Sequence, residues 1–317
     1  MKSAIHIFQR SVGGVVIFYT LQDYLVYYTI FSVYAQKHGL QVLGLAIMYN
    51  HLHILIVGGD RKKVRMFMTV VTSVFARQYN EDSGLSGEVF QHSFGSSVKY
   101  GEKEIRTTAG YLYNNHTNNR LCTKAQNIRW NYLAFAHSEH PFSAPIVLRK
   151  ARICFRRAIK NVNAAHSRGD YLNYASVKRI FKGLNKEEKE QIVDYIISKY
   201  NIIDYKALES LYSSYEEMIY SFNANTHHDY KIPEGEDDRK SDDRFYQSFS
   251  KIVLSFGKVS SLKGLLLLSE DNRLRLALKV QMQTGAPLKQ ICAFFRVRIE
   301  YEKLARGGQP PDSQPFH

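Results

Sequence analysis

The stretch of residues 45–56, LAIMYNHLHILI, decides the fold of this 317-residue chain. Its two apolar halves belong to runs of strand length, Gln41–Met48 and His51–Val57, and only two residues separate these runs. Short apolar runs joined by so tight a connection predict an antiparallel β-hairpin.

The segments on either side of the hairpin predict two more strands and two helices. Before it, Ala4–Gln9 alternates like a strand, and Leu21–Lys37 has helical spacing and ends just before Gly39. After it, Lys62–Tyr79 has the pattern of an amphipathic helix, and a last strand falls within Glu88–Lys99. The order βαββαβ predicts an α+β fold, a ferredoxin-like antiparallel sheet with helices on one face.

Two histidines of the hairpin form a candidate metal site. Because side chains alternate along a strand, His51 and His53 are expected on one sheet face, while Leu52 points into the core beneath. The pair opens an apolar strand directly after a turn, where ligands are held rigidly yet remain accessible to solvent. An ordinary pair of strand histidines is the alternative interpretation.

A tyrosine and an amide on a later segment could share one site. Tyr111 and Asn115 are four residues apart in the expected helix Glu102–Asn115, so they are neighbours on one face. A phenol, with a pKa of roughly 10, is a poor nucleophile at neutral pH unless a metal or a base assists it. A divalent ion that polarises a scissile phosphate would provide this help. In the alternative, Tyr111 and Tyr113 are packed helix aromatics.

These segments resemble the HUH single-tyrosine transposases, that is, the IS200-like and REP-associated tyrosine transposases, over residues 1 to about 135. The stretch 45–56 is similar to the family signature MPNHxHxLx. Three further matches follow in the family's order: Gly87–Gln91 with Phe94 resembles GxVFQ, Tyr111–Asn115 resembles YIHNNP, and Ile128–Tyr132 resembles W-S-S-Y.

The resemblance implies an HUH transposase core that cuts and rejoins single-stranded or hairpin DNA. Tyr111 would attack a phosphodiester, leaving a 5′-phosphotyrosine link and a free 3′-OH. By the same resemblance, His51, His53 and Asn115 would hold Mg²⁺ or Mn²⁺. Whether the protein is a homodimer, and whether Tyr111 serves its own subunit's histidines or those of a partner, stays open.

The chain departs from the family pattern at two places. Tyr49 stands where the family has proline, and His116–Thr117 replace the PV that follows the tyrosine helix. Neither change removes a catalytic atom. His116 is expected to be an exposed helix-end residue, with an additional metal ligand as the alternative.

The composition favours nucleic acid as the partner. A formal charge of +14 attracts polyanions, and 22 Tyr with 18 Phe offer surfaces on which unpaired bases can stack. Apolar stretches fall short of the roughly 20 residues that a membrane helix needs, and the N-terminus lacks a signal-peptide pattern. We therefore expect a cytoplasmic protein without membrane contact.

The carboxy-terminal half lies outside the resemblance. We expect a catalytic domain over 1–140 and a mainly α-helical DNA-binding or accessory region over 141–306, with a mobile loop near 223–243 and a disordered tail over 307–317. Residues 287–306 have the pattern of a helix-turn-helix. Candidate DNA contacts are the basic residues Arg149, Arg152, Arg156, Arg298, Lys303 and Arg306.

Two other functions remain open at this stage. A domesticated protein would bind DNA hairpins without turnover, although His51, His53 and Tyr111 are all present. A replication-initiator nuclease would share the histidine pair and the tyrosine. The segments GEVFQ and NIRW favour the transposase branch over that nuclease.

Overall fold

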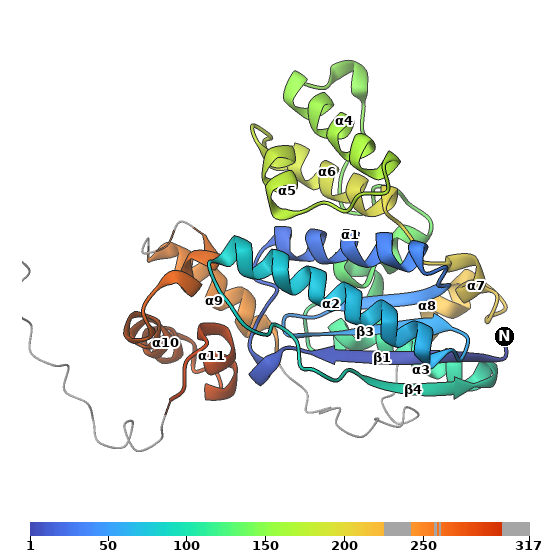
Figure 1. Cartoon of the computed structure of the whole chain (residues 1–317), viewed down its shortest axis with the longest axis horizontal. Helices are drawn as coiled ribbons and strands as arrows, with labels where there is room; N and C mark the ends of the chain where they lie inside the picture. Colours follow the sequence, from blue (N-terminus) through green and yellow to red (C-terminus); the bar gives the residue numbers. More distant parts are fainter. Residues whose placement is uncertain (225–241, 257–258, 260, 300–317) are drawn as a thin grey trace, which may run out of the picture. The chain divides into compact units, whose positions relative to one another are not determined.

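The structure is a computed structural model that describes residues 1–224, 242–256, 259 and 261–299. The chain forms two compact units, Met1–Arg244 and Phe245–His317, of which the first contains the sheet. The first part of that unit runs β1 (Ser3–Arg10), α1 (Leu21–Lys37), β2 (Val42–Ile47), β3 (His51–Val57), α2 (Arg61–Ser83), β4 (Gly95–Tyr100) and α3 (Gly101–Asn118), as Figure 1 shows.

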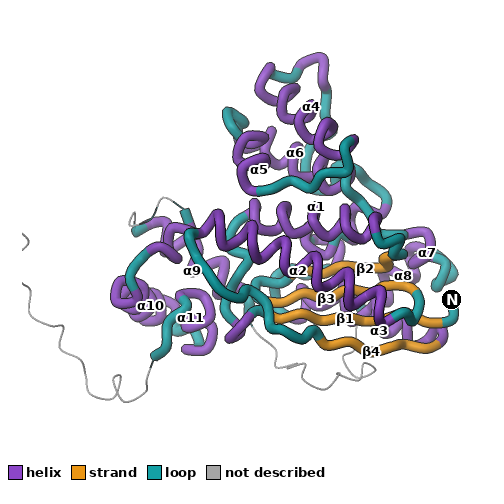
Figure 2. The backbone as a smooth tube through the Cα atoms, viewed as in Figure 1, coloured by secondary structure: helices purple, strands orange, loops and turns teal. Residues whose placement is uncertain are grey.

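The sheet has the expected ferredoxin-like topology. Its strand order is β2-β3-β1-β4, and every neighbouring pair is antiparallel. Helices α1 and α2 pack on one another along one side of the sheet, and α3 packs against all four strands on the other side (Figure 2). The α+β prediction is confirmed, and helices cover both faces of the sheet rather than one.

The hairpin forms where the sequence predicts it. Ile47 pairs with Leu52, and the Met48 N–H donates to the His51 carbonyl at 2.8 Å. The carbonyl of Tyr49, the residue in place of the family's proline, accepts from the N–H groups of Ile17 and Phe18 at 3.0 and 3.1 Å. These bonds fix the turn, so the strand starting at His51 begins at a defined position.

β4 begins later than the sequence suggested. Instead of extending the strand from Glu88, the preceding segment bridges the end of β1, where the Gln91 N–H donates to the Arg10 carbonyl at 2.9 Å. Within the strand, Gly95 pairs with Phe8, whose ring covers the glycine. The GEVFQ segment therefore borders the same end of β1 as the hairpin turn.

The segment with the tryptophan holds α3 and α1 in place. Trp130 stacks on Tyr24 at 4.2 Å between ring centroids, and Tyr132 stacks on Tyr28 at 4.3 Å. The Asn131 side chain donates to the Tyr113 carbonyl of α3 at 3.1 Å. Helix α1 is buried on nearly every side, because α2 and two later helices pack on it in addition to these aromatics.

Helices complete the first unit. They are α4 (Ile153–Ser167), α5 (Tyr174–Phe181), α6 (Lys186–Lys199), α7 (Tyr205–Glu209) and α8 (Tyr215–Asn223). α4 packs on α5 and α6, and both α5 and α6 contact α1. α8 packs on α3, with Phe222 stacked on Tyr113 at 4.9 Å. The helical region expected after residue 140 is confirmed.

The second unit is also helical. It contains most of α9 (Arg244–Ser255), then α10 (Glu270–Thr284) and α11 (Leu288–Phe295), around a core of aromatic residues. Gly285, with φ 62°, ends α10 and lets the chain turn into α11. The first helix of the expected helix-turn-helix is confirmed as α11, whereas most of its second helix, the tail 307–317 and most of the loop 223–243 lie outside the described residues. Among the helices that the structure describes, none is long and apolar enough to span a membrane.

Candidate active site

The expected histidine pair lies under α3. Strand alternation puts His51 and His53 on the same face as Leu55, which belongs to the buried cluster between the sheet and α3. Their ring centroids are 5.2 Å apart, and the rings are perpendicular. His53 is 1% exposed and His51 is half-buried, so the pair is less open to solvent than the sequence suggested.

Helix α3 brings the expected tyrosine and amide to this pair. The Tyr111 ring lies edge-on to His53, with centroids 5.5 Å apart at 90°. One turn later, the Asn115 amide nitrogen lies 3.2 Å from His53 Nε2. Residues 51–53 and 111–115 therefore meet within one chain, and Tyr111 faces the histidines of its own subunit.

A third histidine, which the sequence pattern did not single out, comes from β1. His6 Nε2 lies 3.2 Å from His53 Nδ1, and the His6 ring is also edge-on to Tyr111 at 6.0 Å. Its sheet face offered a signal, because His6, Phe8 and Arg10 alternate to the same side of β1. Nothing in the sequence, however, showed that this side faces the histidine pair.

Two asparagines fix the orientation of the amide at His53. The Asn119 side-chain NH₂ donates to the Asn115 backbone carbonyl at 2.9 Å and to Asn115 Oδ1 at 3.1 Å. A backbone carbonyl can only accept, so the first bond identifies the NH₂ end of Asn119, and the second identifies the oxygen end of Asn115. The NH₂ group of Asn115 consequently faces His53 Nε2, which must accept with its lone pair.

A second pair of hydrogen bonds fixes His51. The Asn50 NH₂ group donates to the Gly14 carbonyl at 2.9 Å, which leaves Asn50 Oδ1 facing His51 Nδ1 at 2.8 Å. The His51 Nδ1 atom therefore carries the hydrogen, and Nε2 carries the lone pair. Metal-binding histidines commonly show this arrangement, in which the distal ring N–H is held by another group.

These histidines are neutral at physiological pH. Burial, and after it the charge of Arg10, lowers the pKa of His51 to about 3. Burial also lowers the pKa of His6 to about 3, and burial with the neighbouring imidazole of His51 lowers the pKa of His53 well below its ordinary value. Each neutral ring has one N–H and one lone pair, which is the form that binds cations.

The donor set fits a divalent cation. His51 and His53 each carry a lone pair on Nε2, and at His53 this lone pair accepts from the Asn115 NH₂ group at 3.2 Å. As it stands, this amide offers its NH₂ group, so binding through Oδ1 would require it to turn over. Among the described residues, no group of three or more His, Cys, Asp or Glu is arranged to hold a metal. The cation would therefore depend on two imidazoles, the amide and oxygen atoms from substrate or water.

The expectation that His116 is exposed was wrong. His116 is 1% exposed, because α3 continues past it to Asn118 and packs this turn against the hairpin. Its Nε2 lies 3.0 Å from the Ile47 carbonyl, while Nδ1 is buried with no hydrogen-bond partner among the described residues. Burial lowers the pKa of His116 to about 4, so it too is neutral at physiological pH.

Tyr113 has a structural role that separates it from Tyr111. Its hydroxyl donates to the Leu43 carbonyl at 2.8 Å, and its ring is fully buried against Phe222. Tyr111 instead lies on the turn of α3 that faces the imidazoles of His6 and His53. The packed-aromatic alternative thus holds for Tyr113, and Tyr111 is also buried, at 4% exposed, with its ring against the two imidazoles.

The basic residues that were expected to contact DNA differ in their surroundings. Arg149 is exposed, and Arg156 is exposed with one bond to the Arg149 carbonyl at 3.2 Å. Arg152 instead forms an ion pair with Glu188 at the start of α6, so it contributes to the fold. Arg298 is exposed in the second unit, whereas Lys303 and Arg306 lie outside the described residues.

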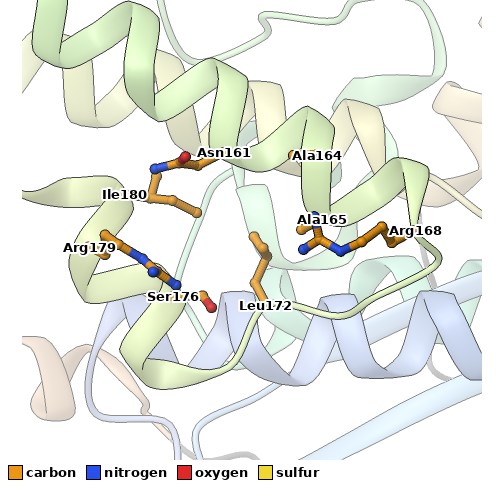
Figure 3. Close-up of a pocket in the computed structure, with 8 residues that line it drawn as sticks. All are labelled: Asn161, Ala164, Ala165, Arg168, Leu172, Ser176, Arg179 and Ile180. Atoms are coloured by element: carbon orange, nitrogen blue, oxygen red, sulfur yellow. The ribbon is translucent and has the colours of Figure 1, made fainter.

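A pocket of about 240 Å³ lies between α4 and α5, away from Tyr111. Figure 3 shows Arg168 and Arg179 on opposite sides of it, with Leu172 between them. Asp170 accepts from Arg168 at 2.8 Å. The residues 149–182, which include this pocket, contain ten Lys or Arg and one acidic residue. This is the most basic part of the first unit.

Comparisons with known proteins show what part of this chain is similar to. Residues 17–115 match the family model described as Transposase IS200 like. Among solved structures, a REP-associated tyrosine transposase bound to a REP hairpin is similar at 12% sequence identity, over 43% of this chain and 78% of that chain, with a TM-score of 0.33. No curated protein matches the chain.

Proposed function

We propose, from the match of residues 17–115 to the family model described as Transposase IS200 like, that the protein cuts and rejoins single-stranded DNA through Tyr111. The observation that carries the proposal is the meeting of Tyr111 with His53 and Asn115 in one buried site. These residues come from segments about 60 positions apart in the sequence. A packing role alone would not require two fixed imidazole lone pairs beside a tyrosine.

The proposed step is a transesterification. The Tyr111 oxygen attacks the phosphorus of a phosphodiester, the new bond links tyrosine to the 5′-phosphate, and the bond to the 3′-oxygen breaks. The phenol proton leaves, and the departing 3′-oxygen takes up a proton. Because one phosphodiester replaces another, a 3′-OH can attack the phosphotyrosine in the reverse sense and rejoin a strand.

His51, His53 and Asn115 are the residues that would hold Mg²⁺ or Mn²⁺. Such an ion would supply polarisation of the scissile phosphate and compensation of its charge. The chain itself positions the site residues: Asn50 orients His51, and α3 holds the Tyr111 ring against the imidazoles. The nearby charge of Arg10, which lowers the pKa of His51, also favours a phosphate at this end of β1.

The basic residues of α4, α5 and the segment before them would hold the DNA backbone. Phosphate contacts by Lys and Arg provide most of the affinity without reading sequence. Arg149 and Arg156 are suited to this because they are exposed, whereas Arg152 is engaged with Glu188. A hairpin would also expose unpaired bases, which aromatic residues can stack on.

The test is covalent capture of DNA. Purified protein is incubated with labelled single-stranded hairpin DNAs and Mn²⁺ or Mg²⁺, and denaturing gels are used to detect an adduct. We expect an adduct that depends on the cation, is lost in Tyr111→Phe and persists in Tyr113→Phe. The second variant is the matched control, because both remove one hydroxyl from the same helix.

Two results would contradict the proposal. An adduct that survives in Tyr111→Phe would assign the nucleophile to another residue. The DNA panel should include the sequences that flank the gene. If hairpins from this panel bind tightly and no adduct forms, the result would instead support a hairpin-binding protein without turnover.

A further inference from the structure

His6 is a fully buried polar residue in the central strand β1, and its ring needs a partner to offset the loss of water. His53 Nδ1 lies 3.2 Å from His6 Nε2. The two rings are tilted by only 7°, and their centroids are 5.3 Å apart. The centroid distance exceeds the N···N distance by about two ring radii, so the imidazoles lie end to end, as a ring-to-ring hydrogen bond requires.

The direction of this hydrogen bond follows from the amide network. The Asn115 NH₂ group faces His53 Nε2, so that nitrogen accepts and the hydrogen of the neutral His53 ring is on Nδ1. Nδ1–H therefore donates to His6 Nε2. The other tautomer of His53 would place its N–H against the NH₂ group of Asn115, and His6 would then have to donate to His53 Nδ1.

We propose that His6 is a positioning residue, which holds His53 in the Nδ1–H tautomer and so presents the Nε2 lone pair to the site. His6 does for His53 what Asn50 does for His51, and both histidines then offer the same ring nitrogen. The tautomer follows from hydrogen bonds within the fold. Its importance for cation binding rests on the proposed function.

Three substitutions of His6 separate this role from simple packing. His6→Leu removes the acceptor and keeps an apolar side chain of similar bulk. His6→Gln keeps an acceptor at nearly the same distance from the backbone, because the end of the Gln side chain coincides with imidazole Nε2. His6→Asn is shorter and serves as the matched control, since its amide cannot reach His53.

The first readout is the tautomer of His53, measured by ¹⁵N side-chain NMR of the protein in the presence of a chelator, with His53→Gln to assign the signal. We expect the Nδ1–H form in the wild type and His6→Gln, and a reduced population of that form in His6→Leu and His6→Asn, where only the Asn115 NH₂ group still favours it. The second readout is Mn²⁺ affinity by calorimetry, where loss of an orienting partner typically costs about 10- to 100-fold. His6→Gln should remain close to the wild type.

The outcomes distinguish this inference from the proposed function. An Nε2–H tautomer in the wild-type protein, or an unchanged Nδ1–H tautomer in both folded His6→Leu and His6→Asn, would overturn the role of His6. If the tautomer depends on His6 but the wild type neither binds Mn²⁺ nor forms a DNA adduct, the positioning role stands and the proposed function fails. If His6→Leu does not fold, the comparison of His6→Gln with His6→Asn decides the question.

Discussion

Tyr111 and Tyr113 are two residues apart on α3 and face different surroundings: the first lies edge-on to His53, and the second donates to the Leu43 carbonyl. A helix turns by about 200° over two residues, which places these side chains on different faces. One faces the proposed chemistry, and the other belongs to the core.

The hydroxyl of Tyr113 should contribute to stability without contributing to catalysis. We expect Tyr113→Phe to lower the free energy of unfolding by about 1 kcal/mol, because the buried Leu43 carbonyl loses its donor. Urea unfolding measures this, and adduct formation measured in parallel should be unchanged. A Tyr113→Phe protein that folds stably but forms no adduct would show that Tyr113 has a role in catalysis.

The effects of substitutions at Phe8 and Gly95 on stability should be strongly coupled. A Cβ placed on Gly95 would lie 1.9 Å from the Phe8 ring, which is itself buried. We expect Gly95→Ala to cost about 1–3 kcal/mol, and to cost much less in a Phe8→Ala background. Denaturant unfolding of the wild type, the two single variants and the double variant gives the four unfolding free energies of a double-mutant cycle. Additive effects would mean that the cost of Gly95→Ala does not come from the Phe8 ring.

Acid should destabilise the protein through its buried histidines. The folded-state pKa is about 3 for His6 and about 4 for His116, both below the ordinary 6.5 that applies in the unfolded chain. Their contribution to stability is complete above pH 6.5 and is lost as the pH falls from 6.5 toward these values. The expected slope is up to about 1.4 kcal/mol per pH unit for each histidine.

Urea unfolding at pH 7.5, 6.5 and 5.5, with a chelator present, tests this dependence. His116→Gln should reduce the slope, because it removes one of these buried imidazoles. Equal unfolding free energies at pH 6.5 and 5.5 would contradict the prediction, since carboxylates titrate mainly at lower pH.

DNA affinity should depend on the exposed arginines and depend less on Arg152. We expect Arg149→Ala and Arg156→Ala each to reduce the dependence of log affinity on log salt by about 1, as the loss of one phosphate contact does. Arg152→Ala should have a smaller effect, because its guanidinium is engaged with Glu188. Fluorescence anisotropy at several salt concentrations measures the slopes. Lys206→Ala, an exposed cation on α7, is the control, and a slope change equal to that of Arg149→Ala would contradict a localised surface.

Much of the fold was predictable because its elements carry strong local patterns. The hairpin at His51, the glycine after Lys37 and the four-residue spacing of Tyr111 and Asn115 each depend on neighbours in the sequence, and the structure confirms each element. The ferredoxin-like order followed from these elements and from the short connections between them.

Features that depend on distant partners were missed. His6 looked like one more residue of an alternating strand, because the register that puts β1 beside β3 is not visible in either strand alone. His116 was expected to be exposed since the pattern of α3 did not show that the hairpin carbonyl of Ile47 lies beside it. Arg152 resembled its basic neighbours, and its partner Glu188 is 36 residues away.

The direct continuation of β4 into α3 has a consequence for the fate of a cut strand. Tyr100 ends the strand, Gly101 with φ 71° begins the helix, and α3 then packs against all four strands. No loop separates β4 from α3, so if Tyr111 forms the proposed link, the attached DNA end could not swing away on a tether. The break would be held where it was made, and resealing would compete at every moment with transfer to a new strand.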